Sequence, residues 1–271
     1  MAVDTASLIT LVELKSQMGI TSTTDDTVLE RCIDRASKAV ESYCARAFTS
    51  NRYYETHDTT SQWAVVLKQN PVTAVRLVAT DWQNALTIDS TDKTDTMTTV
   101  AVNESGLMLF RKDSAGNETA NEPSFATHNT TAELATHING VTGFSATSLI
   151  NLPSVYLRKM SGMSLRTSTA YLGAWMGGFN DYQVDLATGI VYGKQTYGYR
   201  TMFIDYTAGY AQIPYDIQEA TTMIASRIYN GRKRDTGVGS ESLGGYSYSI
   251  RSSGEFDAEA RDLLQTYKRA R

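Results

Sequence analysis

Residues 205–234 read DYTAGYAQIPYDIQEATTMIASRIYNGRKR, and they predict a strand that is followed closely by a long helix. Gly209 ends the strand, because glycine readily adopts the positive φ angle that so sharp a turn requires. Pro214 suits the first helical position, where a backbone N–H is not needed. The helix then carries one apolar stripe, formed by Ile217, Ala220, Ile224 and Ile228. We expect this stripe to pack against another helix of the chain.

The partner helix is predicted near the N-terminus. A short helix over residues 8–18 precedes a longer one over residues 25–48. Apolar residues recur along the longer helix at steps of three and four; they are Leu29, Cys32, Ile33, Ala36, Val40, Tyr43 and Cys44. Its two cysteines would lie roughly 18 Å apart along the helix axis, too far for a disulfide. We therefore expect buried free thiols.

The middle of the chain is β-rich. From Arg52 onward the hydrophobic period changes to two, which predicts strands. Thr130 and Glu133 have the spacing of a capping box, so one short helix is expected there. The predicted fold class is α+β: a helical bundle of N-terminal and C-terminal helices with a β-rich central portion. We assign residues 1–82 and 182–271 to a discontinuous core and residues 83–181 to an inserted module.

The C-terminal segment is predicted to be a flexible glycine-rich connection followed by a last helix over residues 255–271. The apolar face of this helix consists of Phe256, Ala260, Leu263, Leu264 and Tyr267. An isolated helix of this length is marginal in water, so the face needs a partner. The long connection suggests that this partner is an adjacent copy or another protein.

Composition and motifs argue against several functional classes. The formal net charge of −4 gives no overall cationic field for nucleic acid. No apolar run approaches the roughly 18 residues of a membrane span. His57, His128 and His137 form no compact ligand motif, and no nucleophile or phosphate-loop motif is complete. We expect no catalytic, cofactor-binding or metal-binding residues, and therefore no enzyme.

A basic group at the end of the long helix is the remaining candidate site. It consists of Arg227, Arg232, Lys233 and Arg234. Cations at a helix C-terminus can simply satisfy the last carbonyls and the helix dipole. The other interpretation is a positive patch that meets an acidic partner surface or a nucleic-acid backbone.

Several short motifs together resemble the head–tail connector (adaptor) proteins of tailed bacteriophages. The strand–turn–helix signature is carried by Tyr206, Ala208, Gly209, Tyr210, Ile213 and Pro214, with Tyr229, Asn230 and Arg232 at the helix end. The paired opening helices, which close on Tyr43, Cys44, Arg46 and Phe48, are similar to those of the family, and so is the segment LKQNPVTAVRLV. The resemblance covers residues 8–82 and 182–250, whereas the stretch between them departs from the short members.

The resemblance implies a structural virion protein at the head–tail interface, made in the cytoplasm of a bacterial host. It implies a ring, usually of twelve copies, below the portal protein, which extends the DNA channel and docks a tail or neck protein. DNA would pass without specific binding, since an acidic channel repels phosphates. The candidate partner contacts are Arg227, Arg232, Lys233, Arg234, Phe256, Leu263, Leu264 and Tyr267.

Two other hypotheses remain open at this point. One is a different neck or tail-completion protein. The other is a β-rich carbohydrate-binding or hydrolytic virion protein whose site contains Tyr171, Trp175, Phe179 and Tyr182. Exposed aromatic rings can stack on sugars, but aromatics among glycines also form the core of small modules.

Overall fold

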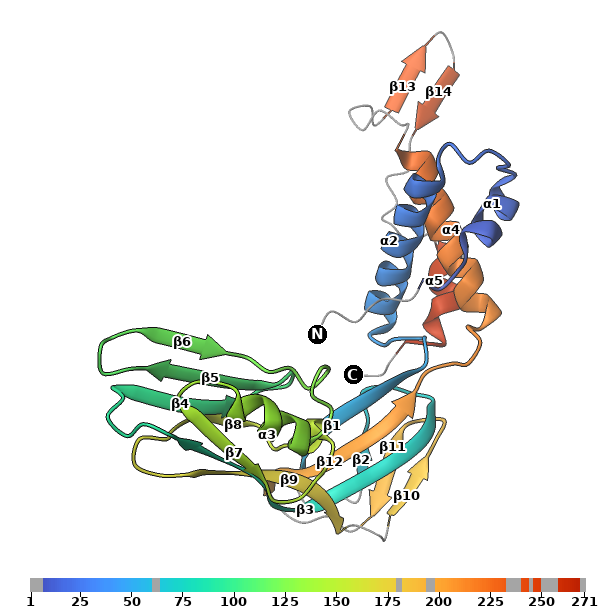
Figure 1. The fold of residues 1–271 in the computed structure, drawn as a ribbon. Coiled ribbons are helices and arrows are strands. Elements are labelled where there is room, and N and C mark those ends of the chain that lie inside the picture. Colours follow the sequence, from blue (N-terminus) through green and yellow to red (C-terminus); the bar gives the residue numbers. More distant parts are fainter. Residues whose placement is uncertain are drawn as a thin grey trace.

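A computed structural model describes residues 7–59, 64–178, 182–193, 198–232, 240–243, 246–249 and 258–268. It contains helices at both ends of the chain and antiparallel strands mostly between them, which confirms the α+β class. Figure 1 shows that most of the helices gather in one part of the molecule and that most of the strands form another part beneath them.

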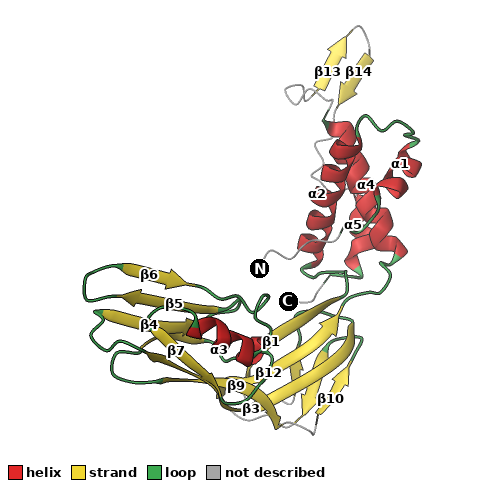
Figure 2. Cartoon of the chain, viewed as in Figure 1, coloured by secondary structure: helices red, strands yellow, loops and turns green. Residues whose placement is uncertain are grey.

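The helical part contains α1 (Leu11–Met18), α2 (Asp26–Cys44), α4 (Tyr215–Gly231) and α5 (Ala258–Gln265) (Figure 2). Their apolar stripes share one core, in which Leu14, Leu29 and Ile217 are fully buried. Both cysteines are buried and free, as expected. Burial of these stripes removes apolar surface from water, which is the main force that stabilises such packing.

The main sheet has the strand order β1 (Asn51–Thr59), β12 (Gly198–Ala208), β3 (Val72–Ser90) and β7 (Phe144–Ser148). β9 (Ala170–Gly178) also pairs with β3. A three-stranded sheet of β10 (Tyr182–Asp185), β11 (Ile190–Gly193) and β2 (Ala64–Val66) packs its apolar residues against those of β12 and β3. All of these pairings are antiparallel.

A four-stranded sheet lies at the other end of the β part (Figure 1). Its strands follow the order β6 (Glu118–Asn121), β5 (Leu107–Lys112), β4 (Met97–Val102) and β8 (Met160–Ser164). The helix α3 (Thr131–Asn139) contacts β7 and β3, and the 3-10 turn η1 (Ser154–Tyr156) contacts β9. Buried residues of α3 share one apolar core with those of β4 and β5. The predicted capping box of Thr130 and Glu133 is confirmed at the start of α3.

The strand β3 connects the two halves of the β part. It pairs with β12 through residues 72–79 and with β9 and β7 through its second half. The boundary predicted between residues 82 and 83 therefore falls inside a continuous strand. The division into a core and an inserted module stays a prediction. The strand β3 belongs to both parts and runs across the predicted boundary.

The stretch expected to be a flexible connection contains a two-stranded hairpin. Its strands are β13 (Ser240–Leu243) and β14 (Tyr246–Ser249). Backbone pairing therefore orders these eight residues, contrary to the expectation for them. Residues 233–239 and 250–257 lie outside the described part of the chain.

Candidate functional site

The strand–turn–helix joint has the geometry that its sequence predicts. Gly209 has a φ angle of 116°, and a Cβ atom at this position would lie 2.4 Å from the Thr49 carbonyl oxygen. The Gly209 N–H donates to Pro71 O at 2.9 Å, and the Tyr210 N–H donates to Phe48 O at 2.8 Å. The end of β12 is thereby bonded to the segment that follows α2 and to the start of β3. Only glycine fits so close an approach without strain.

An arginine and three aromatic rings surround this joint. Arg46 donates a 2.9 Å hydrogen bond to the Tyr210 hydroxyl and lies over the rings of Phe48 and Tyr210. The Phe48 and Tyr267 rings meet edge-on, with centroids 6.1 Å apart. The structure thus brings the signature residues together with the end of α2 and the end of α5.

Tyr206 is fully buried and belongs to a second cluster on β12. Its hydroxyl donates to the Glu55 carboxylate, which also accepts from the Lys68 N–H at 3.2 Å and lies 2.9 Å from His57 Nε2. Burial and the neighbouring carboxylate raise the pKa of Tyr206. Burial alone would raise the pKa of Glu55, but the adjacent His57 ring and the hydrogen bond from Tyr206 outweigh it and lower that pKa. Glu55 is therefore held as a buried anion.

Asp205, the residue before Tyr206, lies on the opposite face of β12 and is also fully buried. Its carboxylate accepts from the Arg52 guanidinium of β1 through both oxygens, with Nε 2.8 Å from Oδ1. The Tyr156 hydroxyl, from η1, donates to Oδ2 at 2.8 Å. Burial and this carboxylate raise the pKa of Tyr156 to about 12. The network joins β1 and β12 to the segment predicted as an insertion.

The basic end of α4 makes contacts within its own chain. Arg232 donates to Asp25 Oδ2 at 2.8 Å, and its guanidinium lies 4.1 Å from the centre of the Tyr229 ring. Arg227 also has an interaction partner in the chain. Lys233 and Arg234 lie outside the described residues. For Arg232, the arrangement agrees with the interpretation of a satisfied helix end.

The last helix packs on its own chain, so the expectation that it docks only elsewhere is wrong for residues 258–268. Leu264 is fully buried in the core of the helical part, where α5 contacts α4 and α2. Leu263 and Tyr267 are partly buried against the same core. The apolar face finds its partner within the chain, and Leu264 has no surface left for another protein. Phe256 lies outside the described residues.

The aromatic residues proposed as a sugar site do not form one surface. Trp175 is buried and stacks on Phe203, with ring centroids 6.1 Å apart. Tyr182 packs into the core beneath the three-stranded sheet, while Tyr171 is exposed. Phe179 lies outside the described residues. The described rings therefore have separate roles, and two of them belong to cores.

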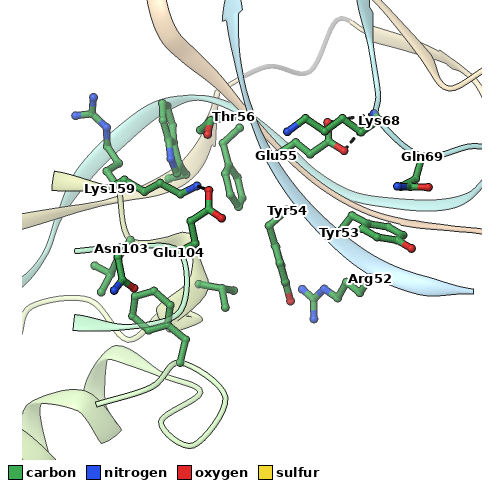
Figure 3. Close-up of a pocket in the computed structure, with 16 residues that line it drawn as sticks. Arg52, Tyr53, Tyr54, Glu55, Thr56, Lys68, Gln69, Asn103, Glu104 and Lys159 are labelled. Atoms are coloured by element: carbon green, nitrogen blue, oxygen red, sulfur yellow. Dashed lines mark hydrogen bonds and ion pairs between the residues drawn. The ribbon is translucent and has the colours of Figure 1, made fainter. Parts of the chain in front are cut away.

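A pocket of about 320 Å³ lies beside β1. Residues 52–56 of β1, with Lys68 and Gln69, line one side of it, and Asn103, Glu104 and residues 157–159 line the other. Figure 3 shows the two groups facing each other across the space. Apolar side chains of Phe125, Val155, Trp175 and Phe203 complete its wall. The sequence did not predict this pocket, because its walls come from segments far apart in the chain.

Neither a membrane span nor a metal centre is found in the described parts of the chain. Among those residues no helix is long and apolar enough to cross a membrane. The same residues contain no group of three or more histidine, cysteine or acidic side chains placed to hold a metal ion.

Comparisons with known proteins find one matching family model and several distantly similar structures. Residues 8–108 match the family described as "Phage gp6-like head-tail connector protein". No curated protein matches this chain. Solved structures that align with all of it include the neck of an empty GTA particle computed with C6 symmetry, at 13% identity over 94% of that chain and a TM-score of 0.39.

Two further structures of gene transfer agent (GTA) particles align with the whole chain. The neck of the native particle, computed with C12 symmetry, has 14% identity over 93% of that chain and a TM-score of 0.38. The virion of the native particle has 14% identity over 94% of that chain and a TM-score of 0.40. Similarity at this level does not bear on the function of this chain.

Proposed function

We propose, from the match of residues 8–108 that places this chain in the phage head–tail connector family, that it is a ring-forming subunit of a virion neck. The sequence motifs predicted this family, and the match confirms it. The chain is accordingly a structural protein of the neck or connector type. The ring, its partners and its channel are the proposed part.

The match to the family carries the proposal. It covers α1, α2, β1, β2, β3 and β4 and the first residues of β5. The signature joint lies outside it in sequence, but Gly209 and Tyr210 are hydrogen-bonded to Pro71 and Phe48, which lie within it. Since the joint and the matched segment are bonded to each other, both features of the family belong to one folded unit.

In the proposed ring, the four helices act as a helical bundle and twelve copies surround a channel below the portal protein. A net-acidic wall suits such a channel, because it repels the phosphates of passing DNA. The ring would also dock a tail or neck protein on its other side. Arg227, Arg232, Lys233, Arg234, Leu263 and Tyr267 are the proposed partner contacts, with Leu264 withdrawn because it is buried.

Negative-stain electron microscopy tests the proposal directly. The purified chain should be imaged alone and after mixing with the portal protein of the same particle. We expect rings with a central opening, at the latest when the portal is present. Monomers in both samples would overturn the ring. A third sample that contains the purified tail separates the alternative, because binding to the tail without binding to the portal would favour a tail-completion protein.

A further inference from the structure

The outer edge of β1 is an open strand edge. β1 pairs with β12 on one side, and between Arg52 and His57 no other described backbone group bonds to it. Alternate N–H and C=O groups along this edge therefore point away from the sheet. The pocket follows the edge, because side chains from both faces of β1 line it, including Tyr53, Tyr54 and Glu55. An open edge of this kind is a template for another strand.

The wall opposite the edge holds an arginine without a carboxylate partner in the described residues. The Arg158 guanidinium lies 4.3 Å from the centre of the Trp82 ring and 5.1 Å from that of Trp175. Neighbouring Lys159 forms an ion pair with Glu104. Desolvation by burial lowers the pKa of Arg158. The two indole rings hold the guanidinium in a fixed orientation.

The charges of the pocket favour an acidic occupant. Its lining includes four cationic side chains (Arg52, Lys68, Arg158 and Lys159) but only two carboxylates, Glu55 and Glu104. Glu55 accepts from Tyr206, Glu104 is paired with Lys159, and Arg52 is paired with the buried Asp205. Among the described residues, Arg158 and Lys68 are therefore the lining cations without an ion pair. The chain as a whole is net acidic, so this cationic excess is local. A carboxylate beside Arg158 would form a charge-assisted hydrogen bond.

We propose that the pocket binds an extended peptide segment of a partner protein, which adds a strand to the open edge of β1. One side chain of the segment is apolar and contacts Trp175, Phe203 and Phe125. A second side chain, two residues along on the same face, is acidic and binds Arg158. Main-chain bonds to the edge supply affinity, and the two side-chain contacts supply specificity. The inference goes beyond the proposed ring and does not require it.

The test is an NMR titration of the full chain with a blocked hexapeptide, Val-Thr-Asp-Thr-Leu-Thr. In an extended conformation its apolar and acidic side chains share one face. We expect saturable shifts at the amides of residues 52–57 and at the Trp175 indole N–H. Arg158→Gln should weaken binding by about tenfold, as expected for a lost charge-assisted bond. Arg158→Lys should weaken it less, and Arg31→Gln, an exposed site on α2, should leave it unchanged.

Two control ligands test whether the pocket recognises the acidic side chain of an extended peptide. The same peptide with lysine in place of aspartate should bind at least about tenfold more weakly. Inorganic phosphate at equal concentration should cause no shift along residues 52–57. Any of three results would overturn the inference. The first is that the peptide causes no saturable shifts up to 10 mM, roughly the weakest affinity of interest. The second is that the lysine peptide binds equally well, and the third is that phosphate causes equal shifts. Because the titration uses the chain alone, its result is independent of whether rings form.

Discussion

The Tyr156 hydroxyl donates a 2.8 Å hydrogen bond to Asp205 Oδ2, and this bond links η1 to the strand that carries the connector signature. Asp205 is fully buried and also accepts from Arg52. Four residues after Asp205, β12 has ended at Gly209, where the chain turns toward α4. The position of the central segment is therefore coupled through one buried carboxylate to the joint between sheet and helices.

Replacement of Tyr156 by phenylalanine tests this coupling. Tyr156→Phe removes one donor from a buried carboxylate, so we expect the free energy of unfolding to fall by about 1–3 kcal/mol. Tyr171→Phe is the matched control, because Tyr171 is 58% exposed. Urea denaturation of both variants provides the measurement. Equal stability of the two variants would show that the bond contributes nothing to the fold.

The glycine at the joint leads to a second prediction. Gly209→Ala should lower the free energy of unfolding by about 3 kcal/mol or more, because it combines a positive φ angle with a Cβ atom 2.4 Å from Thr49 O. Gly19→Ala is the matched control: Gly19 also has a positive φ, but its Cβ would meet nothing within 4 Å. That control should cost roughly 1–2 kcal/mol. Thermal unfolding compares them, and equal losses would contradict the steric argument.

Features encoded locally in the sequence were predictable. The turn at Gly209 and the capping box of Thr130 and Glu133 depend on residues within a few positions of each other, and both are present. The contact of α2 with α4 also followed from their apolar stripes. Periodicity and capping report on local backbone preference, so they identify elements reliably when the pattern is strong.

Features that depend on distant segments were not predictable. Tyr156 and Asp205 are 49 residues apart in sequence, and the pocket beside β1 is assembled from seven separate segments of the chain. The strand β3 also continues through the polar residues Asp81, Gln83 and Asn84 as an exposed, irregular stretch, across the boundary predicted between residues 82 and 83. The position of α5 was mispredicted because an apolar face requires a partner without specifying which one.

A third prediction concerns pH. The folded-state pKa of Glu55 is lowered, so Glu55 stabilises the fold above its unfolded pKa, near 4.5, and loses this contribution as pH falls through the folded value. We expect Glu55→Gln to lower stability at pH 7 and to flatten the loss of stability below about pH 4.5. Glu30→Gln, on the exposed face of α2, is the control. An unchanged acid slope in Glu55→Gln would contradict the assignment.

The basic end of α4 leads to a fourth prediction, which rests on the proposed ring. Arg227→Glu combined with Arg232→Glu should block ring assembly, while the free energy of unfolding changes by less than about 1 kcal/mol. Arg261→Glu, on the exposed face of α5, should assemble normally. Mass photometry and thermal unfolding give the two readouts.

A charge swap separates a partner contact from the intrachain pair in this region. Arg232→Glu with Asp25→Arg restores an ion pair between these positions but leaves the surface charge of the helix end reversed. If Arg232 contacts a partner, the swap should still fail to assemble. Full assembly of the swap variant would assign Arg232 to the helix end alone.

The last prediction concerns α5, whose Leu264 is fully buried against the helical core while Leu263 is only partly buried. We expect the amides of α5 to be protected from hydrogen exchange in the free monomer, because their helix already has its apolar partner. Leu264→Ala should cost about 2–5 kcal/mol through lost burial and the cavity left behind. Leu263→Ala, the matched control, should cost less. Fast exchange of α5 in the monomer, with protection only after assembly, would instead mean that this face belongs to a neighbouring subunit.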